Sequence, residues 1–320
     1  MPQPDASSVH IDAILTNISV AYVQGLEMFG ATKIFPIVPV EKQTDKYFVF
    51  TKADWFRDEA HVRAGGSESA GSGYGLSTAT YAADVFALHK DVDDQTRANA
   101  DDPLSPDSDA TRFVTQRLLL RREIQFVADY MVTGVWDTDK TGTTNFTKWS
   151  DYAASDPIED IELGKETILQ NTGYMPNRLV LGYKTFRRLK HHPDVVDRFK
   201  YTSPDSITEE MLARLFEVEQ VVVMRAVKNT AAEGATAVMA FVTGVDDALL
   251  CYANPSPGLL APSAGYIFSW RAISGGLGVD IPISRFRMEH LRSDRIEAEI
   301  AFDHKVVAKD LGYFYDDAVD

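Results

Sequence analysis

Residues 64–75 read Ala-Gly-Gly-Ser-Glu-Ser-Ala-Gly-Ser-Gly-Tyr-Gly. A segment this rich in glycine loses too much conformational freedom on folding to order itself. It is preceded by a run of strand formers at 47–51 and followed by another at 78–92. The pattern predicts a long β-hairpin with a flexible tip. With about twenty residues per limb at about 3.3 Å each, the hairpin could reach on the order of 60 Å, more than a compact domain needs to close a turn.

Aromatic side chains flank this tip at Tyr47, Phe48, Trp55 and Phe56. Core burial is the usual fate of such residues, but a hairpin this extended has no core of its own. Burial within the chain and burial against a partner are therefore both open for them. We expect the extended loop to form an assembly interface through the following residues: Trp55, Phe56, Arg57, Gly65, Gly66, Gly71, Gly73 and Gly75.

The N-terminal part of the chain shows two patterns. Apolar residues recur at helical spacing at Ile14, Ile18, Tyr22 and Leu26. Residues 35–40 then read Phe-Pro-Ile-Val-Pro-Val. Two prolines in an extended segment exclude a central strand, because proline cannot donate a ladder hydrogen bond. The segment is therefore expected to be an arm or an edge strand.

Two helices are expected in the middle of the chain. The segment Asp107-Ser108-Asp109 offers N-caps for a helix over 109–133, which spans roughly 37 Å at 1.5 Å per residue. A second helix should begin at Asp156-Pro157 and end before Gly173, because proline suits the first helical position and acidic residues suit the first turn. The apolar stripe expected on the long helix is Phe113, Leu120, Ile124, Val127 and Met131.

From Pro176 onward, strand and helix patterns alternate, which predicts an α/β lobe. The expected helices are 185–191 and one opened by the capping box Ser206-Ile207-Thr208-Glu209, with a break at Pro193 between them. The expected strands of this lobe are 179–181, 221–227, 237–242 and 249–252.

Three more strands are expected after the loop at 255–258, namely 266–273, 281–290 and 295–307. In the last of these, apolar residues alternate with charged ones, so one face should be buried and the other wet. The apolar residues of that alternation are Ile296, Ala298, Ile300 and Phe302.

Composition limits the class of protein. The chain has 320 residues, 45% hydrophobic and 25% charged, which is enough for two globular lobes. No stretch approaches the roughly 18 apolar residues of a membrane span, and the first residues do not resemble a signal peptide, so we expect a cytosolic product. Cys251 is the single cysteine, which excludes an intramolecular disulfide and a thiolate metal cluster.

Signatures of catalysis are missing from the sequence, since no Gly-x-Ser-x-Gly, His-Glu-x-x-His or Cys/His pattern occurs. The pair His191-His192 lacks the i, i+4 spacing of a chelate, so we expect it on the surface or at a helix end. Residues 71–75 resemble a phosphate-binding loop only superficially, because no Gly-Lys-Ser/Thr follows. We therefore expect no catalytic, cofactor-binding or metal-binding residues. Solvated turns are expected at the paired acids Asp93-Asp94, Asp101-Asp102, Asp246-Asp247 and Asp316-Asp317.

Several segments together resemble the major capsid proteins of tailed bacteriophages that share the Hong Kong 97 fold. The resemblance runs from residue 15 to about 313. In the first half it is carried by Leu-Thr-Asn-Ile-Ser-Val-Ala-Tyr at 15–22, by 35–40, by Trp-Phe-Arg-Asp-Glu at 55–59 before Glu-Ser-Ala-Gly at 68–71, and by Asp-Asp-Gln-Thr-Arg-Ala-Asn-Ala at 93–100. Later it is carried by 177–182, 192–198, 255–259 and 284–289.

The resemblance implies an α+β fold with four parts. Residues 1–46 would be an N-terminal arm, and 47–90 an extended loop that lies across a neighbouring subunit. Residues 91–165 and 285–320 would form a peripheral domain with the long helix as its spine. Residues 166–284 would form the axial domain, which meets its copies around fivefold and sixfold centres.

The same resemblance implies a structural protein rather than an enzyme. Pentamers and hexamers of the chain would build the icosahedral head of a tailed phage in the host cytoplasm and enclose double-stranded DNA in the virion capsid. No cofactor and no membrane contact are implied. A separate scaffolding protein is expected because no long charged helical leader is present, together with a portal and decoration proteins.

The formal net charge of −15 disfavours DNA binding through the phosphate backbone, since that binding needs lysine and arginine. An acidic wall would not stick to packed DNA, although solubility alone explains the charge equally well. Two other functions stay open. The chain could form the shell of a bacterial nanocompartment of the same fold, or it could be an α/β enzyme with a dispersed site.

Overall fold

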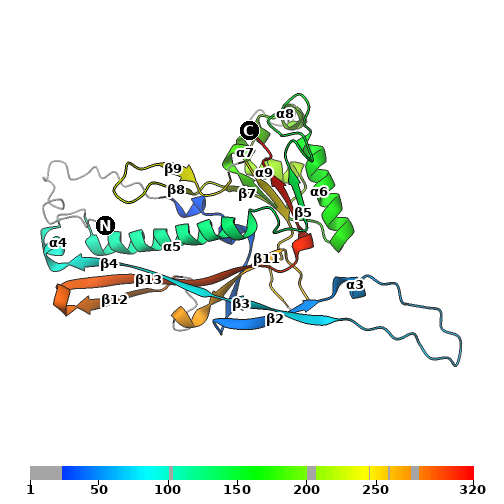
Figure 1. Ribbon diagram of the computed structural model, residues 1–320, viewed down its shortest axis with the longest axis horizontal. Coiled ribbons are helices and arrows are strands. Elements are labelled where there is room, and N and C mark those ends of the chain that lie inside the picture. Colours follow the sequence, from blue (N-terminus) through cyan, green and yellow to red (C-terminus); the bar gives the residue numbers. More distant parts are fainter. Residues whose placement is uncertain (1–23, 101–103, 200–206, 245, 259, 275–280) are drawn as a thin grey trace.

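The computed structural model describes residues 24–100, 104–199, 207–244, 246–258, 260–274 and 281–320. Two five-stranded sheets organise these residues into two lobes, and a two-stranded ribbon extends away from both (Figure 1). Helices and strands are mixed along the whole described chain, so the expected α+β class is confirmed.

The first sheet is organised around β13 (Ser293–Val306). Along one edge β13 pairs with β4 (Asp84–Asp93), and along the other with β12 (Ile283–Met288) and then β11 (Gly265–Trp270), all antiparallel. β1 (Ile37–Val40) joins β11 in parallel as an edge strand, where Pro39 can be tolerated. Of the two expectations for 35–40, the edge strand is therefore confirmed. The expected alternation of β13 is also confirmed, because its four apolar residues are buried.

The long helix α5 (Pro106–Tyr130) runs along one face of this sheet (Figure 1). It begins with a proline in its first turn, after Ser105, and not at the N-caps that we expected. Asp107 and Asp109 instead lie in the first turn, where negative charge opposes the helix dipole favourably. The length of 25 residues matches the prediction.

The apolar stripe expected on α5 is correct only in part. The residues buried toward the sheet recur every fourth position, and of the expected set only Met131, at the helix end, is fully buried. Phe113 and Val127 are partly buried against the main core. Leu120 and Ile124 pack instead on a smaller cluster around Phe29, which Val127 also contacts. The helix buries two faces, so the large residues alone do not identify the main one. The buried residues at every fourth position are Ala110, Val114, Leu118, Arg122, Phe126 and Tyr130.

The second sheet has the order β5-β14-β10-β6-β7. Its strands are β5 (Thr138–Thr141), β14 (Gly312–Asp316), β10 (Ala248–Cys251), β6 (Arg178–Gly182) and β7 (Gln220–Met224). β6 and β7 are parallel and β10 runs antiparallel to both of its neighbours. The α/β lobe is therefore confirmed as an architecture.

Four helices belong to this lobe: α6 (Pro157–Thr172), α7 (Tyr183–Lys190), α8 (Pro193–Phe199) and α9 (Glu209–Leu215). α6 begins and ends as predicted, since Asp156 caps its N–H groups and Gly173 ends it at φ 73°. The expected break is confirmed, because α7 ends at Lys190 and a separate helix begins at Pro193. That helix, α8, was not expected. Thr208 caps α9 by accepting from the N–H of Met211, which corrects the expected Ser206 cap. Ser206 lies outside the described residues.

The single strand expected at 221–227 is two strands. β7 ends at Met224, and β8 (Val227–Asn229) pairs with β9 (Met239–Phe241) in a separate hairpin. The sheets also cross the domain boundaries that we expected. β14, from the 285–320 segment, and β5, from the 91–165 segment, lie in the sheet of the α/β lobe. β11, from the 166–284 segment, lies in the sheet under α5.

Part of the expected arm belongs to the core. η1 (Leu26–Met28) is followed by α2 (Ala31–Ile34), and Phe35 is fully buried against Phe126 and Tyr130, with ring centroids 5.9 and 4.7 Å away. The chain from Phe29 to β1 is thus packed into the molecule and is not a free arm. Of the expected helical stretch, 14–22 lies outside the described residues.

The extended hairpin is confirmed, but its paired part is shorter than expected. β2 (Thr44–Phe50) and β3 (Leu76–Ala82) form seven antiparallel pairs, or about 23 Å of ribbon. The second limb of the hairpin is interrupted at Ala83, which is fully buried. Beyond this residue β4 no longer pairs with β2 but with β13 of the first sheet. The short helix α3 (Lys52–Trp55) follows β2, and the rest of the connection extends beyond both lobes (Figure 1). Within the described ranges, none of the helices has the length and apolar character of a membrane span.

Candidate assembly interface

One face of the ribbon is anchored on the chain's own body. The rings of Tyr47 and Tyr81 lie 5.6 and 4.7 Å from the ring of Phe268, and Tyr266 completes the cluster. The Tyr81 hydroxyl donates a hydrogen bond to the carbonyl oxygen of Lys42 at 3.2 Å. Burial raises the pKa of both Tyr47 and Tyr81. The ribbon is therefore held at its base and projects from a fixed position.

A cluster of three aromatic rings lies where the ribbon meets the tip. The centroids of Phe50, Trp55 and Tyr74 are 5.4 to 6.1 Å apart. Two hydrogen bonds close the chain beneath them. The N–H of Thr51 donates to the carbonyl of Gly75 at 3.1 Å, and the N–H of Gly75 donates to Oδ2 of Asp54 at 2.9 Å. The base of the tip is thus ordered although the sequence around it is rich in glycine.

The glycines of the tip differ in what they do. Nothing lies within 4 Å of a Cβ placed on Gly65, Gly66, Gly71 or Gly73, and of these only Gly66 has a left-handed φ, 83°. A Cβ on Gly75 would lie 2.6 Å from Oγ1 of Thr51. Close packing therefore requires glycine at position 75. At the other four positions no neighbouring atom restricts the backbone of the outer tip.

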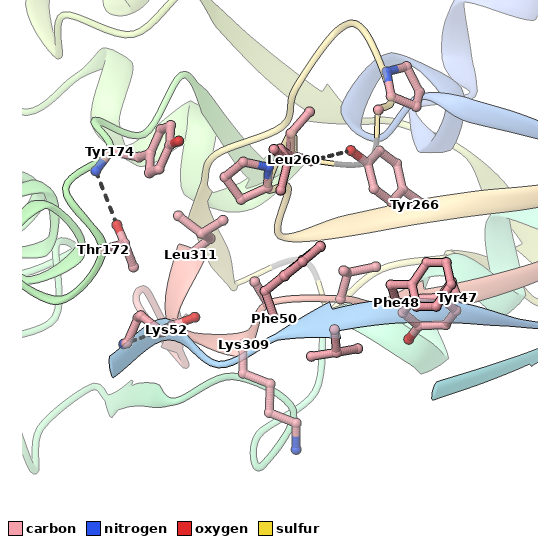
Figure 2. A pocket seen from close by; sticks show the side chains of 18 of the residues that line it. Tyr47, Phe48, Phe50, Lys52, Thr172, Tyr174, Leu260, Tyr266, Lys309 and Leu311 are labelled. Carbon is pink, nitrogen blue, oxygen red and sulfur yellow. Dashed lines mark hydrogen bonds and ion pairs between the residues drawn. The ribbon is translucent and has the colours of Figure 1, made fainter. Parts of the chain in front are cut away.

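A cleft of about 850 Å³ separates the outer part of the ribbon from the body (Figure 2). The ribbon side contributes Phe48, Phe50, Trp55 and Phe56. Lys52 at the ribbon's end forms an ion pair with Asp310 of the body. The body side is lined by residues from four segments, including Thr172, Tyr174, Leu260, Tyr266, Lys309 and Leu311.

The cleft is apolar and open to solvent. Phe48, Trp55, Phe56 and Leu260 are 54%, 53%, 64% and 64% exposed. The ring of Phe56 lies against Gly173, where an added Cβ would be 3.4 Å away. Large exposed apolar residues gathered in one place are a general feature of surfaces that bind other molecules. The prediction from sequence included Trp55 and Phe56 but missed Leu260, whose only signal is an apolar residue in a loop.

The remaining expected residue of the loop, Arg57, stays on the surface. Its guanidinium lies 3.8 Å from carboxylate oxygens of both Asp54 and Glu59, and its side chain is 61% exposed. At that distance and exposure, neither ion pair fixes the side chain. The eight residues expected from sequence lie along one loop. Trp55 and Phe56 line the cleft, and Gly75 packs at the ordered base of the tip.

Buried Ser155 and His192, with the exposed Asp194, have the composition of a hydrolase triad but the wrong hydrogen-bond polarity. The Ser155 hydroxyl donates to the carbonyl of Asp151 at 2.7 Å, so it accepts from Nε2 of His192 at 3.0 Å. Nδ1 of His192 accepts from the N–H of Asp194 at 3.3 Å, which assigns the ring proton to Nε2. With the ring proton on Nε2, His192 donates to the serine and does not act as its general base.

The histidine pair lies at two helix ends, as expected, since His191 follows α7 and His192 precedes α8. The side chain of His192 is fully buried, whereas that of His191 is exposed. Burial lowers the pKa of His192, which keeps the ring neutral. The ring ties the segment before α6 to the start of α8, a structural role. Across the described ranges, no group of three or more His, Cys, Asp or Glu residues could hold a metal ion.

Two of the paired acids are not simple solvated turns. Asp247 is buried, and burial raises the pKa of its carboxyl to about 7. Asp93 caps α4 (Asp94–Asn99) by accepting from the N–H and hydroxyl of Thr96, both at 2.6 Å. These side chains lie within one chain and do not face the cleft. The pair at 101–102 lies outside the described residues.

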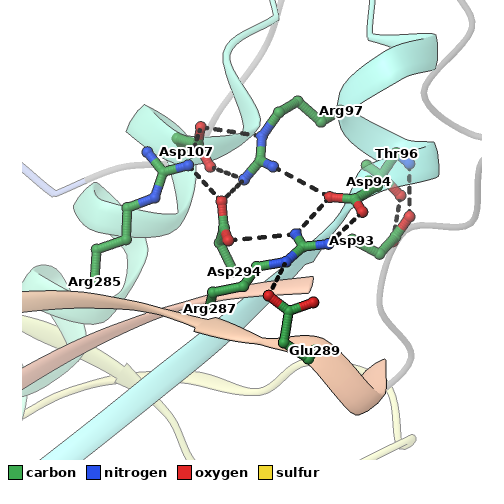
Figure 3. A network of polar contacts seen from close by, with 9 residues as sticks. All are labelled: Asp93, Asp94, Thr96, Arg97, Asp107, Arg285, Arg287, Glu289 and Asp294. Atoms are coloured by element: carbon green, nitrogen blue, oxygen red, sulfur yellow. Dashed lines mark hydrogen bonds and ion pairs between the residues drawn. The ribbon is translucent and has the colours of Figure 1, made fainter. Parts of the chain in front are cut away.

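The lobe formed by α5 and the sheet around β13 has an ion-pair network at the end that lies away from the α/β lobe (Figures 1 and 3). Nη2 of Arg97 lies 2.8 Å from Asp107 and 2.9 Å from Asp294. Arg287 reaches Asp94 at 2.6 and 2.7 Å and Asp294 at 3.4 Å. Asp294 is the shared centre, and it accepts from a third arginine, Arg285. The network joins α4, the first turn of α5 and the β12–β13 hairpin.

Taken together, two lobes, a long helix along the sheet of one of them and a ribbon with exposed apolar side chains are the features of the Hong Kong 97-like class of capsid proteins. No family model matches the chain. The major capsid protein of Burkholderia phage BcepMu is 29% identical over 245 residues, which cover 72% of this chain and 76% of that protein. The major capsid protein of Pseudomonas phage JBD67 is 25% identical over 312 residues, 97% of each chain.

Solved structures agree with these relatives. A phage-related protein from Bordetella bronchiseptica RB50 is 26% identical, with a TM-score of 0.67 over 97% of this chain and 98% of that one. The capsid of cyanophage P-SCSP1u has a TM-score of 0.64 at 10% identity over 97% and 93%, which supports the fold alone. The chain described here is a major capsid protein of the tailed-phage type.

Proposed function

We propose that this chain assembles with copies of itself into the closed icosahedral head of a tailed phage and encloses double-stranded DNA there. The observation that carries the proposal is the open apolar cleft beneath the ribbon, with Phe48, Trp55, Phe56 and Leu260 at least half exposed. Covering those side chains against a second copy removes apolar area from water, at about 25 cal/mol for each Å² buried. A subunit with this surface is incomplete by itself.

The parts of the fold suit this role with amended boundaries. The extended loop is the ribbon of β2 and β3 with the connection between them. The sheet around β13 with α5 would serve as the peripheral domain, and the sheet β5-β14-β10-β6-β7 with its helices as the axial domain. The two lobes are rigid and the projecting loop can change its pose. This combination lets identical chains occupy the slightly different environments of pentamers and hexamers.

The partners follow from the same role. We infer a separate scaffolding protein, a portal and decoration proteins, with assembly in the host cytoplasm and the virion capsid as the final location. The net charge of −15 suits a wall that encloses DNA without binding its sequence. We also infer that the protein has no catalytic turnover, which the hydrogen-bond polarity at Ser155 and His192 supports.

A nanocompartment shell is the second candidate. The shell protein of the SrpI encapsulin complex from Synechococcus elongatus PCC 7942 has a TM-score of 0.53 over 100% of this chain and 97% of that one, but at 10% identity it shares the fold alone. The two relatives named major capsid protein favour the phage head. Co-purification of one specific cargo enzyme with nucleic-acid-free shells would favour the nanocompartment instead.

Deleting residues 64–73 tests the role of the extended loop. The deletion keeps Tyr74 and Gly75, whose contacts close the base of the ribbon. We expect the variant to remain folded, with an unchanged circular dichroism spectrum, and to form no shells by negative-stain electron microscopy. A replacement of the same ten residues by a Gly-Ser sequence of equal length separates the effect of length from that of side chains. Shells from the deletion variant in wild-type yield would contradict the proposed role.

A further inference from the structure

Helices α6 and α7 carry opposite charge on two sides of the same lobe. In Figure 1 the strands of this sheet lie between α7, on the left, and α6, on the right. α6 packs on β10 and β14, whereas α7 packs on β6 and β7. The side chains that each helix directs at the sheet are buried, so its exposed side chains point outward.

The outward face of α6 is acidic and aliphatic. Glu159, Leu163, Glu166 and Leu169 recur at helical spacing and all four are exposed, the two leucines by 48% and 43%. Neither glutamate forms an ion pair with a described residue. The one cation of this helix, Lys165, is buried and is held at 2.9 Å by Glu162 and at 3.0 Å by Glu217. The charge of this face is therefore not neutralised by the residues that the structure describes.

The outward face of α7 is basic and aromatic. The helix has four cations and no acidic residue. Arg188 is occupied, since its guanidinium donates to the carbonyl oxygen of Asp320 at 3.4 Å. Arg187 and Lys190 make no ion pair among the residues that the structure describes. Tyr183 stacks one face of its ring on Phe241 at 5.5 Å and is still 40% exposed. This face thus complements the face of α6 in both charge and apolar content.

We propose that the α6 face of one subunit docks on the α7 face of the next subunit in a ring, with Glu159 and Glu166 opposite Arg187 and Lys190. The inference rests on the proposed shell function and names the contact that orders subunits within a ring. Two different, complementary faces on one chain form a head-to-tail contact, which closes into a ring when the rotation permits. The opposite charges determine how the two faces align. They also disfavour a contact between two α6 faces or between two α7 faces, because like charges repel across an interface.

Charge reversal tests the pairing. Glu159→Lys with Glu166→Lys gives two basic faces, and Arg187→Glu with Lys190→Glu gives two acidic faces. We expect each double variant to stay folded and to lose ring and shell formation in native mass spectrometry. The quadruple variant restores opposite charges and should recover assembly. The quadruple variant contains every substitution of both double variants, including those whose charges oppose the helix dipoles. It should therefore fold no better than either double variant, so that recovered assembly would come from the restored pairing of charges.

A mixture of the two double variants gives a sharper result. Alternating subunits place opposite charges at every contact of a six-membered ring, but a five-membered ring must contain one contact between identical variants. We therefore expect the mixture to form hexamers and to lose pentamers. Wild-type assembly by either double variant alone, or a folded quadruple variant that stays monomeric, would overturn the pairing and leave the shell function standing. Failure of the wild-type chain to assemble would overturn the proposed function itself.

Discussion

Oδ1 of Asp247 accepts a hydrogen bond from the backbone N–H of Asp317, 3.1 Å away. This bond ties the start of β10 to the chain that follows β14. Asp247 is buried, and Asp246, Asp316 and Asp317 add negative charge around it. Burial first, and then these neighbours, raise the pKa of its carboxyl from 3.8 to about 7. Between these two values the folded state holds a proton that the unfolded state releases, so stability falls as the pH rises.

The variant Asp247→Asn should remove this penalty and keep the acceptor for Asp317. We expect its advantage in unfolding free energy over the wild type to grow between about pH 4 and pH 7 and to stay constant above. The upper bound is on the order of 4 kcal/mol, from about three pKa units at 1.36 kcal/mol each. Urea unfolding at pH 5 and pH 8 checks this. An advantage that is equal at both pH values would contradict the assignment.

Glu123 should be the most sensitive charged residue of the core. Its carboxylate accepts from the N–H groups of Gly30 and Ala31 at 2.8 and 3.0 Å, which satisfies the first turn of α2. Glu123→Ala leaves both donors buried without partners, and we expect a loss of about 2–3 kcal/mol in unfolding free energy. Glu123→Gln keeps one acceptor and should lose less. Equal losses for the two variants in denaturant titrations would show that the carboxylate does not cap the helix.

The network around Asp294 should stabilise the protein in a salt-dependent way. Arg285, Arg287 and Arg97 lower the pKa of this carboxyl, chiefly through the hydrogen bond from Arg285. Because the folded pKa is depressed, the stabilisation is present above the unfolded value and is lost as the pH falls through the folded value. We expect Asp294→Asn to lower the Tm by a few degrees at low salt and by less in 1 M NaCl, where charges are screened. Glu289→Gln, at the edge of the network, is the matched control with little expected change.

The sequence predicts local structure better than it predicts partners. Asp156, Pro157 and Gly173 mark the ends of α6 correctly, because caps act through neighbouring backbone groups. The division of the second hairpin limb at Ala83 was missed, because strands on either side pair with segments distant in sequence. Sheet membership of β14 was missed for the same reason, since a strand's partner is set by the whole fold.

The candidate site shows the same limit. The exposed aromatics of the loop could be predicted because Trp55 and Phe56 lie beside a glycine-rich tip within one continuous segment. The other wall of the cleft could not, since Tyr174, Leu260 and Leu311 come from three distant segments. The burial of Asp247 was also hidden, because a pair of aspartates in sequence has the pattern of a turn.

Gly75 should be the one glycine of the tip that assembly cannot spare. An alanine Cβ there would lie 2.6 Å from Oγ1 of Thr51, whereas a Cβ on Gly71 meets nothing within 4 Å. We expect Gly75→Ala to open the base of the ribbon, to speed proteolysis between 51 and 75, and to reduce the yield of shells. Overpacking of this kind costs about 1–3 kcal/mol.

A second substitution separates the clash from other effects of the alanine. Thr51→Ala removes the oxygen that the new Cβ meets, so the double variant Thr51→Ala with Gly75→Ala should regain protease resistance and shell yield. Gly71→Ala is the matched control and should behave as wild type. If Gly75→Ala and Gly71→Ala are cleaved at the same rate and give equal shell yields, the ordered base of the ribbon has no part in assembly. A double variant that stays as weak as Gly75→Ala alone would mean that the loss comes from the N–H contact with Asp54 and not from crowding at Thr51.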